Sequence, residues 1–173
     1  MQHADVPLLG FAAASGTGKT TLLEQLIPLL KQQGVRVGLI KHTHHNVQID
    51  QPGKDSFRLR AAGAAPVMLC SSHRRVIMTD FAEVTEPKLF NELEYFDQSQ
   101  VDLILVEGFK SECFPKIELH RQELDQDFLY PHDSNIIAVA TDTLLDIPTH
   151  LTQLDINQPK AVAEFIKHYM DTL

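Results

Sequence analysis

Apolar residues follow two different patterns along this chain. Short, nearly continuous apolar runs cover residues 6–12, 35–40, 101–106 and 136–140, as in strands that are buried on both faces of a sheet. Apolar residues recur every three or four positions over residues 22–30, 89–96 and 159–170, which predicts helices. Strands that alternate with helices predict an α/β fold, with a mostly parallel sheet and helices on both of its faces.

Three segments depart from this alternation. Residues 66–70 and 75–79 are apolar runs separated by four polar residues, which predicts an antiparallel hairpin that joins the sheet. Residues 57–62 predict a short helix that ends at Gly63. Residues 122–133 are polar and acidic and predict a long loop.

Length, composition and charge exclude several classes of protein. A chain of 173 residues with 43% hydrophobic content predicts a single domain, residues 1–173, with a true core. A net charge of −8 argues against a general nucleic-acid binder. No apolar run approaches the roughly 18 residues of a membrane helix, and residues 1–5 lack the basic, apolar start of a signal peptide. Cys70 and Cys113 lack metal-site spacing, so we expect a reduced cytoplasmic protein.

The segment after the first predicted strand carries the clearest chemistry. It is rich in glycine, ends in Lys-Thr and leads into a helix, which is the arrangement of the P-loop, or Walker A motif, of P-loop NTPases. The motif usually starts with Gly, and this chain has Ala13 there. The residues that we expect to bind nucleotide here are Ser15, Gly16, Thr17, Gly18, Lys19, Thr20 and Thr21.

Each of these residue types suits a polyphosphate. Gly16 and Gly18 allow backbone amides to turn toward the β-phosphate, and the helix N-terminus favours an anion. The Lys19 ammonium can bridge the β- and γ-phosphates and is a candidate catalytic group. The Thr20 hydroxyl is expected to ligate Mg²⁺, and Thr21 to reach the α-phosphate.

Three carboxylates are further candidates, each with a plainer alternative. Glu107 ends the most apolar strand, where an acidic group can hold Mg²⁺, or it is an exposed acid without a role. Asp50 is a candidate for Mg²⁺ binding and for orienting the attacking water, or it belongs to a solvated loop. Asp142 follows the last apolar strand, where a carboxylate can accept hydrogen bonds from guanine. Asn and Lys, which usually accompany such a carboxylate in GTPases, are missing, and a turn residue is the alternative.

His42, His44 and His45 follow the second predicted strand. Imidazole is a common metal ligand, but no cysteine accompanies these residues, and adjacent side chains on an extended loop point apart. A phosphate-sensing or partner-contact role is therefore favoured over a metal site.

Several segments together resemble one family. They are residues 41–45 (KHTHH), 50–56 (DQPGKDS), 61–64 (AAGA) and 105–110 (LVEGFK), which follow the P-loop in one order. This combination closely resembles the MobB family of GTP-binding adapters in molybdopterin guanine dinucleotide biosynthesis. The resemblance implies a homodimer that binds GTP and Mg²⁺, with weak GTPase activity. It also implies partnership with the molybdopterin guanylyltransferase, and it makes the molybdenum-inserting protein a second candidate partner.

Two other functions compete with this interpretation. A P-loop small-molecule kinase would need an acceptor pocket and usually an arginine-bearing lid, and residues 122–133 contain no Arg or Lys. A binding module that nucleotide merely stabilises would keep its partner affinity without nucleotide.

Overall fold

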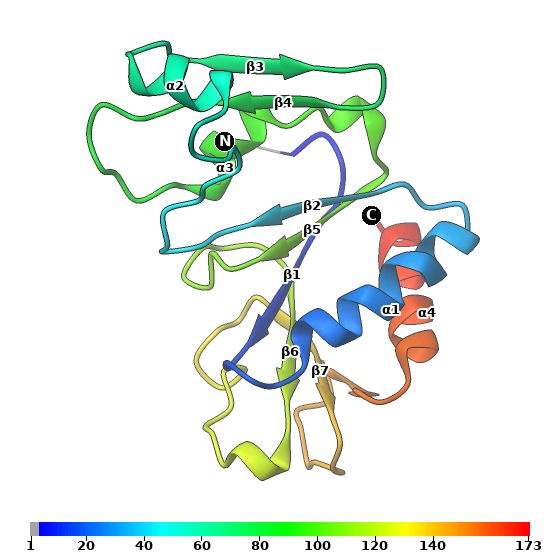
Figure 1. The fold of residues 1–173 in the computed structure, drawn as a ribbon. Coiled ribbons are helices and arrows are strands. Elements are labelled where there is room, and N and C mark those ends of the chain that lie inside the picture. The colour runs from blue at the N-terminus through cyan, green and yellow to red at the C-terminus, as the bar shows by residue number, and fades with distance from the viewer. Residues whose placement is uncertain (1–3) are drawn as a thin grey trace. The chain divides into compact units, whose positions relative to one another are not determined.

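A computed structural model describes residues 4–173 (Figure 1). Residues 1–3, which belong to the segment inspected for a signal peptide, lie outside the described residues. The chain divides into two compact units. The first runs up to His42 and resumes over Lys88–Leu173, and the second is Thr43–Pro87. Each unit is described by itself, and the single domain over residues 1–173 stays a prediction.

The first unit is built on a six-stranded sheet in the order β2-β5-β1-β6-β7-β8. All neighbouring strands in it are parallel, which confirms the predicted fold class. Strands β1 and β5 are almost wholly buried, as their continuous apolar runs predict. The strands are β1 (Leu8–Ala13), β2 (Val37–Lys41), β5 (Leu103–Glu107), β6 (Lys116–His120), β7 (Ile136–Thr141) and β8 (Thr152–Asp155).

Helices cover both faces of this sheet, because successive strand residues point to opposite sides. Leu9 of β1 packs in one core cluster with residues of α1 (Lys19–Gln32) and α4 (Pro159–Asp171). Figure 1 shows these two helices side by side. Leu8 packs instead in a second cluster with α3 (Leu89–Glu92) and η1 (Leu93–Tyr95). Two more 3-10 turns, η2 (Gln98–Gln100) and η3 (Gln122–Leu124), lie in loops.

The second unit contains α2 (Asp55–Ala61) and the antiparallel pair β3 (Val67–Cys70) and β4 (Arg75–Met78). The hairpin prediction is confirmed, but its expected place is wrong, because β3 and β4 form a sheet of their own. Both faces of this small sheet have exposed positions, and Met68 and Ile77 are 54% and 56% exposed. A two-stranded sheet buries little apolar area, so this unit depends more on polar contacts.

Over residues 4–173, no helix is both long enough and apolar enough to span a bilayer.

Candidate functional site

The loop between β1 and α1 has the backbone of an anion site. Gly16 and Gly18 have φ angles of 84° and 91°, which residues with a side chain rarely adopt. Gly18 is also the N-cap of α1, and in the described structure no side chain caps this helix and its first turn has no acidic residue. The amide groups of the first turn therefore have no side-chain acceptor, as phosphate binding requires.

The structure brings Lys19 and Glu107 together at the end of the sheet. β5 lies beside β1, with Phe11 in register with Glu107, so the strand delivers its terminal carboxylate to the phosphate loop. The Lys19 Nζ lies 3.5 Å from Glu107 Oε1, and the Lys41 Nζ lies 3.3 Å from Glu107 Oε2. The Glu107 side chain is only 14% exposed, and its carboxylate forms ion pairs with both lysines.

A tight turn fixes the direction of Glu107. Gly108 and Phe109 both have positive φ angles, of 97° and 51°. A Cβ on Gly108 would lie 2.7 Å from the His42 Cβ, and the His42 backbone N–H donates to the Glu107 carbonyl at 2.8 Å. The rings of His42 and Phe109 stack with their centroids 4.7 Å apart. The ends of β2 and β5 are thus locked together beside the loop.

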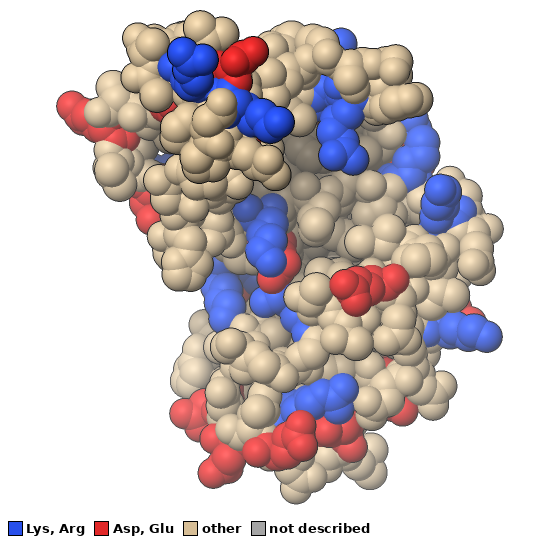
Figure 2. All heavy atoms as spheres, viewed as in Figure 1, with Lys and Arg blue, Asp and Glu red and all other residues tan. Residues whose placement is uncertain are grey.

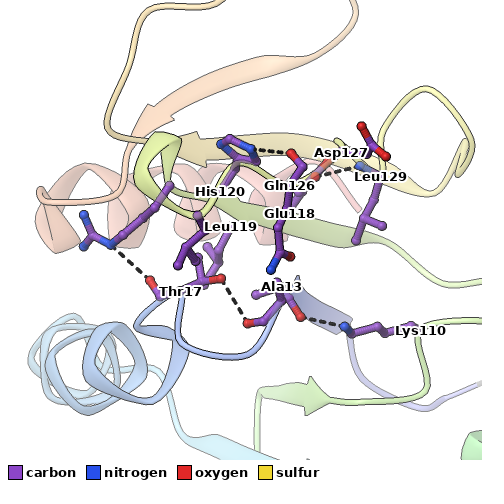
Figure 3. Close-up of a pocket in the computed structure, with 12 residues that line it drawn as sticks. Ala13, Thr17, Lys110, Glu118, Leu119, His120, Gln126, Asp127 and Leu129 are labelled. Atoms are coloured by element: carbon purple, nitrogen blue, oxygen red, sulfur yellow. Dashed lines mark hydrogen bonds between the residues drawn. The ribbon is translucent and has the colours of Figure 1, made fainter.

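Lys110 is a site residue that the motif analysis did not single out. Its Nζ donates to the Ala13 carbonyl at 2.6 Å, as Figure 3 shows. Burial lowers the pKa of Lys110, and the charge of nearby Lys19 lowers it further. Its sequence signal was its place at the end of the segment 105–110 that carries the family resemblance, three residues after Glu107. Lys110 brings a second ammonium group to the start of the phosphate loop.

Asp142 and Arg121 lie on the other side of the loop. The Arg121 Nε donates to the Thr17 carbonyl at 3.1 Å, and Arg121 NH1 donates to Asp142 Oδ2 at 3.3 Å. The Gln122 backbone N–H donates to Asp142 Oδ1 at 3.1 Å and, as the largest influence, lowers the pKa of Asp142. Asp142 is therefore ionised at neutral pH and is linked to the phosphate loop through one arginine.

Two hollows flank this loop. A cavity of ≈ 140 Å³ lies between the loop, the end of β6 and the segment after it (Figure 3). Its labelled polar residues include Lys110, Glu118 and His120. A shallower groove of ≈ 300 Å³ runs from the loop along the start of α1 toward α4. That groove is lined by Gly18, Thr21, Leu22, Gln25, Arg121, Ile156, Asn157 and Pro159.

The remaining predicted nucleotide residues divide into buried and exposed ones. Thr17 is buried, and its hydroxyl donates to the Ala14 carbonyl at 3.0 Å, so this side chain shapes the loop. Ser15, Thr20 and Thr21 are exposed, as residues that contact a bound nucleotide must be. Thr20 and Glu107 each carry side-chain oxygen atoms, the ligand type that Mg²⁺ prefers, so the chemistry of these two residues fits the expected cation.

Asp50, His44 and His45 belong to the second unit. The Asp50 carboxylate is buried and accepts from Arg60 NH2 at 2.9 Å, while Arg60 NH1 donates to Asp80 at 3.1 Å. Arg60 thus links two carboxylates of the second unit. The catalytic and Mg²⁺-binding roles of Asp50 stay predictions, as does the role of the two histidines.

Comparison with known proteins agrees with this geometry. The family model of molybdopterin guanine dinucleotide synthesis protein B matches residues 8–142. The chain is 47% identical to a molybdopterin-guanine dinucleotide biosynthesis adapter protein of Haemophilus influenzae, over 95% of this chain and 90% of the relative. It is 46% identical to the protein of that name from Escherichia coli, over 95% and 94%. A crystal structure of molybdopterin-guanine biosynthesis protein B shares the fold, with a TM-score of 0.72, 24% identity and coverage of 94% and 99%. The chain therefore belongs to the MobB family, the molybdopterin guanine dinucleotide synthesis protein B family.

Proposed function

We propose that this protein is a GTP-binding adapter in molybdopterin guanine dinucleotide biosynthesis, with weak Mg²⁺-dependent GTPase activity. Family membership supports the adapter role. The observation that carries nucleotide binding is the uncapped N-terminus of α1 next to the Lys19–Glu107 ion pair. The Lys19 ammonium lies 3.5 Å from Glu107, next to backbone amides that no side chain caps. A phosphate bound to these amides would attract the ammonium away from Glu107.

Glu107 can release Lys19 without losing all of its counter-charge. When Lys19 turns to the β- and γ-phosphates, Lys41 still lies 3.3 Å from Glu107. Thr20 and Glu107 would then hold Mg²⁺, which supplies charge neutralisation at the β- and γ-phosphate oxygens. In hydrolysis, water would attack the γ-phosphorus while the bond from that phosphorus to the β-phosphate oxygen breaks, which gives GDP and free phosphate. The described part of the first unit offers no clear group to orient this water. Slow turnover follows, because a missing positioning group costs orders of magnitude in rate.

Asp142 is proposed to select guanine. Its ionised carboxylate can accept from both the N1–H and the N2 amino group of guanine, and adenine offers no matching pair of donors. Two hydrogen bonds, from Gln122 and Arg121, already orient the carboxylate. A carboxylate has about four lone-pair sites, so it retains capacity for two more donors.

The proposed protein partners are a second copy of this chain, the molybdopterin guanylyltransferase and the molybdenum-inserting protein, in the cytoplasm. Apolar side chains on the hairpin support a protein contact: Met68, Leu69 and Ile77 are all exposed. Met68 and Ile77 pair across the two strands and share one face, so their exposed side chains are neighbours, and contiguous exposed apolar surface marks interaction sites.

The charge on the surface weakens the kinase alternative. The segment after β6 carries Glu123, Asp125 and Asp127, all exposed, and Figure 2 shows acidic side chains gathered at that end of the molecule. Residues 122–133 contain no Arg or Lys, so they cannot serve as the arginine-bearing lid that a kinase usually needs.

Titration of the purified protein with GTP, GDP and ATP, each with and without Mg²⁺, tests the proposal. We expect tighter binding of GTP than of ATP, and we expect the Asp142→Ala variant to lose this preference. Free phosphate should appear slowly, without a phosphorylated metabolite. Tighter binding of ATP would contradict the proposal and favour the kinase. Equal affinity for the guanylyltransferase with GTP, GDP and no nucleotide would favour the binding module.

A further inference from the structure

Arg121 contacts the phosphate loop, Asp142 and the groove beside them. Its Nε donates to the Thr17 carbonyl in the phosphate loop, and its NH1 donates to Asp142. Its NH2 donates to the Asn157 side-chain oxygen at 3.2 Å, at the far end of the 300 Å³ groove. A single guanidinium thus joins three segments that are distant in the sequence.

The order of the strands explains why an arginine occupies this place. The phosphate loop follows β1 and Asp142 follows β7, and β6 lies between these two strands. Arg121 directly follows β6, so its side chain starts midway between the two. A nucleotide has a fixed span from its phosphates to the edge of its base, so the spacing between loop and carboxylate must be held constant.

Arg121 also retains groups that a ligand can use. A guanidinium has five N–H donors, and three of its hydrogen bonds are made within the protein. Its planar face can stack on a nucleobase. The same side chain lines the groove with Gly18 and Thr21, next to the expected α-phosphate contact. Its side chain is 26% exposed, which leaves it accessible from the groove.

We propose that Arg121 is a positioning residue for guanine recognition, which holds the Asp142 carboxylate at a fixed distance from the phosphate loop and forms one wall of the base subsite. It takes over the task of the Asn and Lys that are missing before Asp142. This inference rests on the proposed binding of guanine nucleotides. It adds that specificity for the base depends on an arginine from β6, outside the segment that contains Asp142.

The test compares three ligands that share a triphosphate: GTP, ITP, which lacks the 2-amino group, and inorganic tripolyphosphate, each with Mg²⁺. We expect Arg121→Ala to weaken GTP binding by about 10- to 100-fold, since hydrogen bonds to charged groups are of that strength. Binding of tripolyphosphate should change by less than about 3-fold, because the amides and Lys19 remain. The ratio of GTP to ITP affinity should fall toward one.

Two further variants separate positioning from simple charge. Arg121→Lys keeps the positive charge but has no planar fork, so its ratio of GTP to ITP affinity should stay close to that of Arg121→Ala. In a double variant with Asp142→Ala, the ratio should fall no further than in Asp142→Ala alone, because the two residues act as a unit. The matched control is Arg36→Ala, since Arg36 makes a similar pair with Asp102 at the start of β2 and β5.

The possible results point to different conclusions. A parallel loss for GTP, ITP and tripolyphosphate would show that Arg121 only stabilises the loop, and would overturn the inference. An unchanged ratio in Arg121→Ala, with a clear preference for GTP in the wild type, would overturn it and leave the proposed function intact. A wild type without preference for GTP over ITP would overturn both. If Arg121→Ala does not fold, Arg121→Lys and Arg121→Gln give the same comparison.

Discussion

Two lysine–carboxylate pairs of the first unit differ in a way that separates function from structure. The Lys116 Nζ lies 2.9 Å from Asp133 and 2.6 Å from the Glu112 carbonyl, and its side chain is only 2% exposed. The Phe114 ring lies against the same ammonium, with its centroid 4.8 Å away. The Lys19 Nζ is 3.5 Å from Glu107, and its side chain is 18% exposed. Lys116 is buried and makes short contacts to its partners, whereas Lys19 is more exposed and lies farther from its partner.

The surroundings of the two carboxylates sharpen this contrast. Glu107 has a second cation in Lys41, so Lys19 can leave without stranding a buried charge. Among the described residues, Asp133 is the one carboxylate bonded to Lys116, and its other oxygen accepts from Asn135. In the Lys19–Glu107 pair, Lys41 can replace Lys19 as the counter-charge, so Lys19 is able to move to a ligand. The Lys116–Asp133 pair has no such substitute within residues 4–173 and holds its loop in place.

Breaking the buried pair should have the largest effect on stability. Asp133→Ala leaves the Lys116 ammonium buried without a counter-charge, and removing one partner of such a pair costs about 3–5 kcal/mol. Urea denaturation measures this loss. The control is Asp171→Ala, which breaks the exposed Lys167–Asp171 pair and should cost less than about 1 kcal/mol. Equal costs for the two variants would contradict the contrast.

Gly108→Ala should come next, because the turn that directs Glu107 has no room for a Cβ. The new atom would lie 2.7 Å from the His42 Cβ at a φ angle of 97°. Overpacking of this kind costs about 1–3 kcal/mol. Gly34→Ala is the matched control, because Gly34 has a φ angle of 82° but no atom within 4 Å of the added Cβ. A cost of Gly108→Ala that does not exceed the control would show that the turn is not tightly packed.

Lys19→Ala should change the free energy of unfolding by less than about 1 kcal/mol, because Lys41 still lies 3.3 Å from Glu107 as a counter-charge. Lys41→Ala alone should change the free energy of unfolding by a similarly small amount, because Lys19 then remains beside Glu107. The double variant leaves Glu107 with neither lysine and should cost more than the sum of the single changes. Strict additivity in urea denaturation would argue that the two lysines do not share Glu107.

The smallest effect is expected at the surface pair of Arg36 and Asp102. Hydrogen bonds from the Arg36 side chain, and then the one from its backbone N–H, lower the pKa of Asp102 to about 2, while an unfolded Asp titrates near 3.9. The folded pKa is the lower one, so the stabilisation is present above pH about 4 and is lost as the pH falls toward 2. The difference in melting temperature between wild type and Asp102→Asn should shrink over that window. A difference that is constant from pH 5 to 2 would contradict this.

Most of the main sheet could be predicted from the sequence, because β1, β2, β5 and β7 are nearly continuous apolar runs and the helices have apolar stripes, whereas β6 and β8 carry polar residues and lack that signal. The P-loop was evident from Gly16, Gly18 and Lys19, whose types and spacing serve one chemistry. The place of Glu107 followed from its position at the end of a buried strand. These features are local, so a single sequence is enough to show them.

Contacts between distant segments could not be predicted in the same way. Lys110 reaches back to Ala13, and Arg121 reaches both Thr17 and Asp142, through pairings that sequence spacing does not reveal. The hairpin was predicted as a hairpin, but it forms a sheet of its own, which the spacing of apolar residues does not reveal. Contacts of this kind are set by tertiary packing and not by local sequence.

The central claim is that Lys19 leaves Glu107 to bind a polyphosphate, and titration of GTP with Mg²⁺ into wild type and Lys19→Ala tests it most directly. We predict a loss of affinity of about 10- to 100-fold in the variant, with a melting temperature close to that of the wild type without ligand. Equal affinity of the two proteins for GTP would contradict the account.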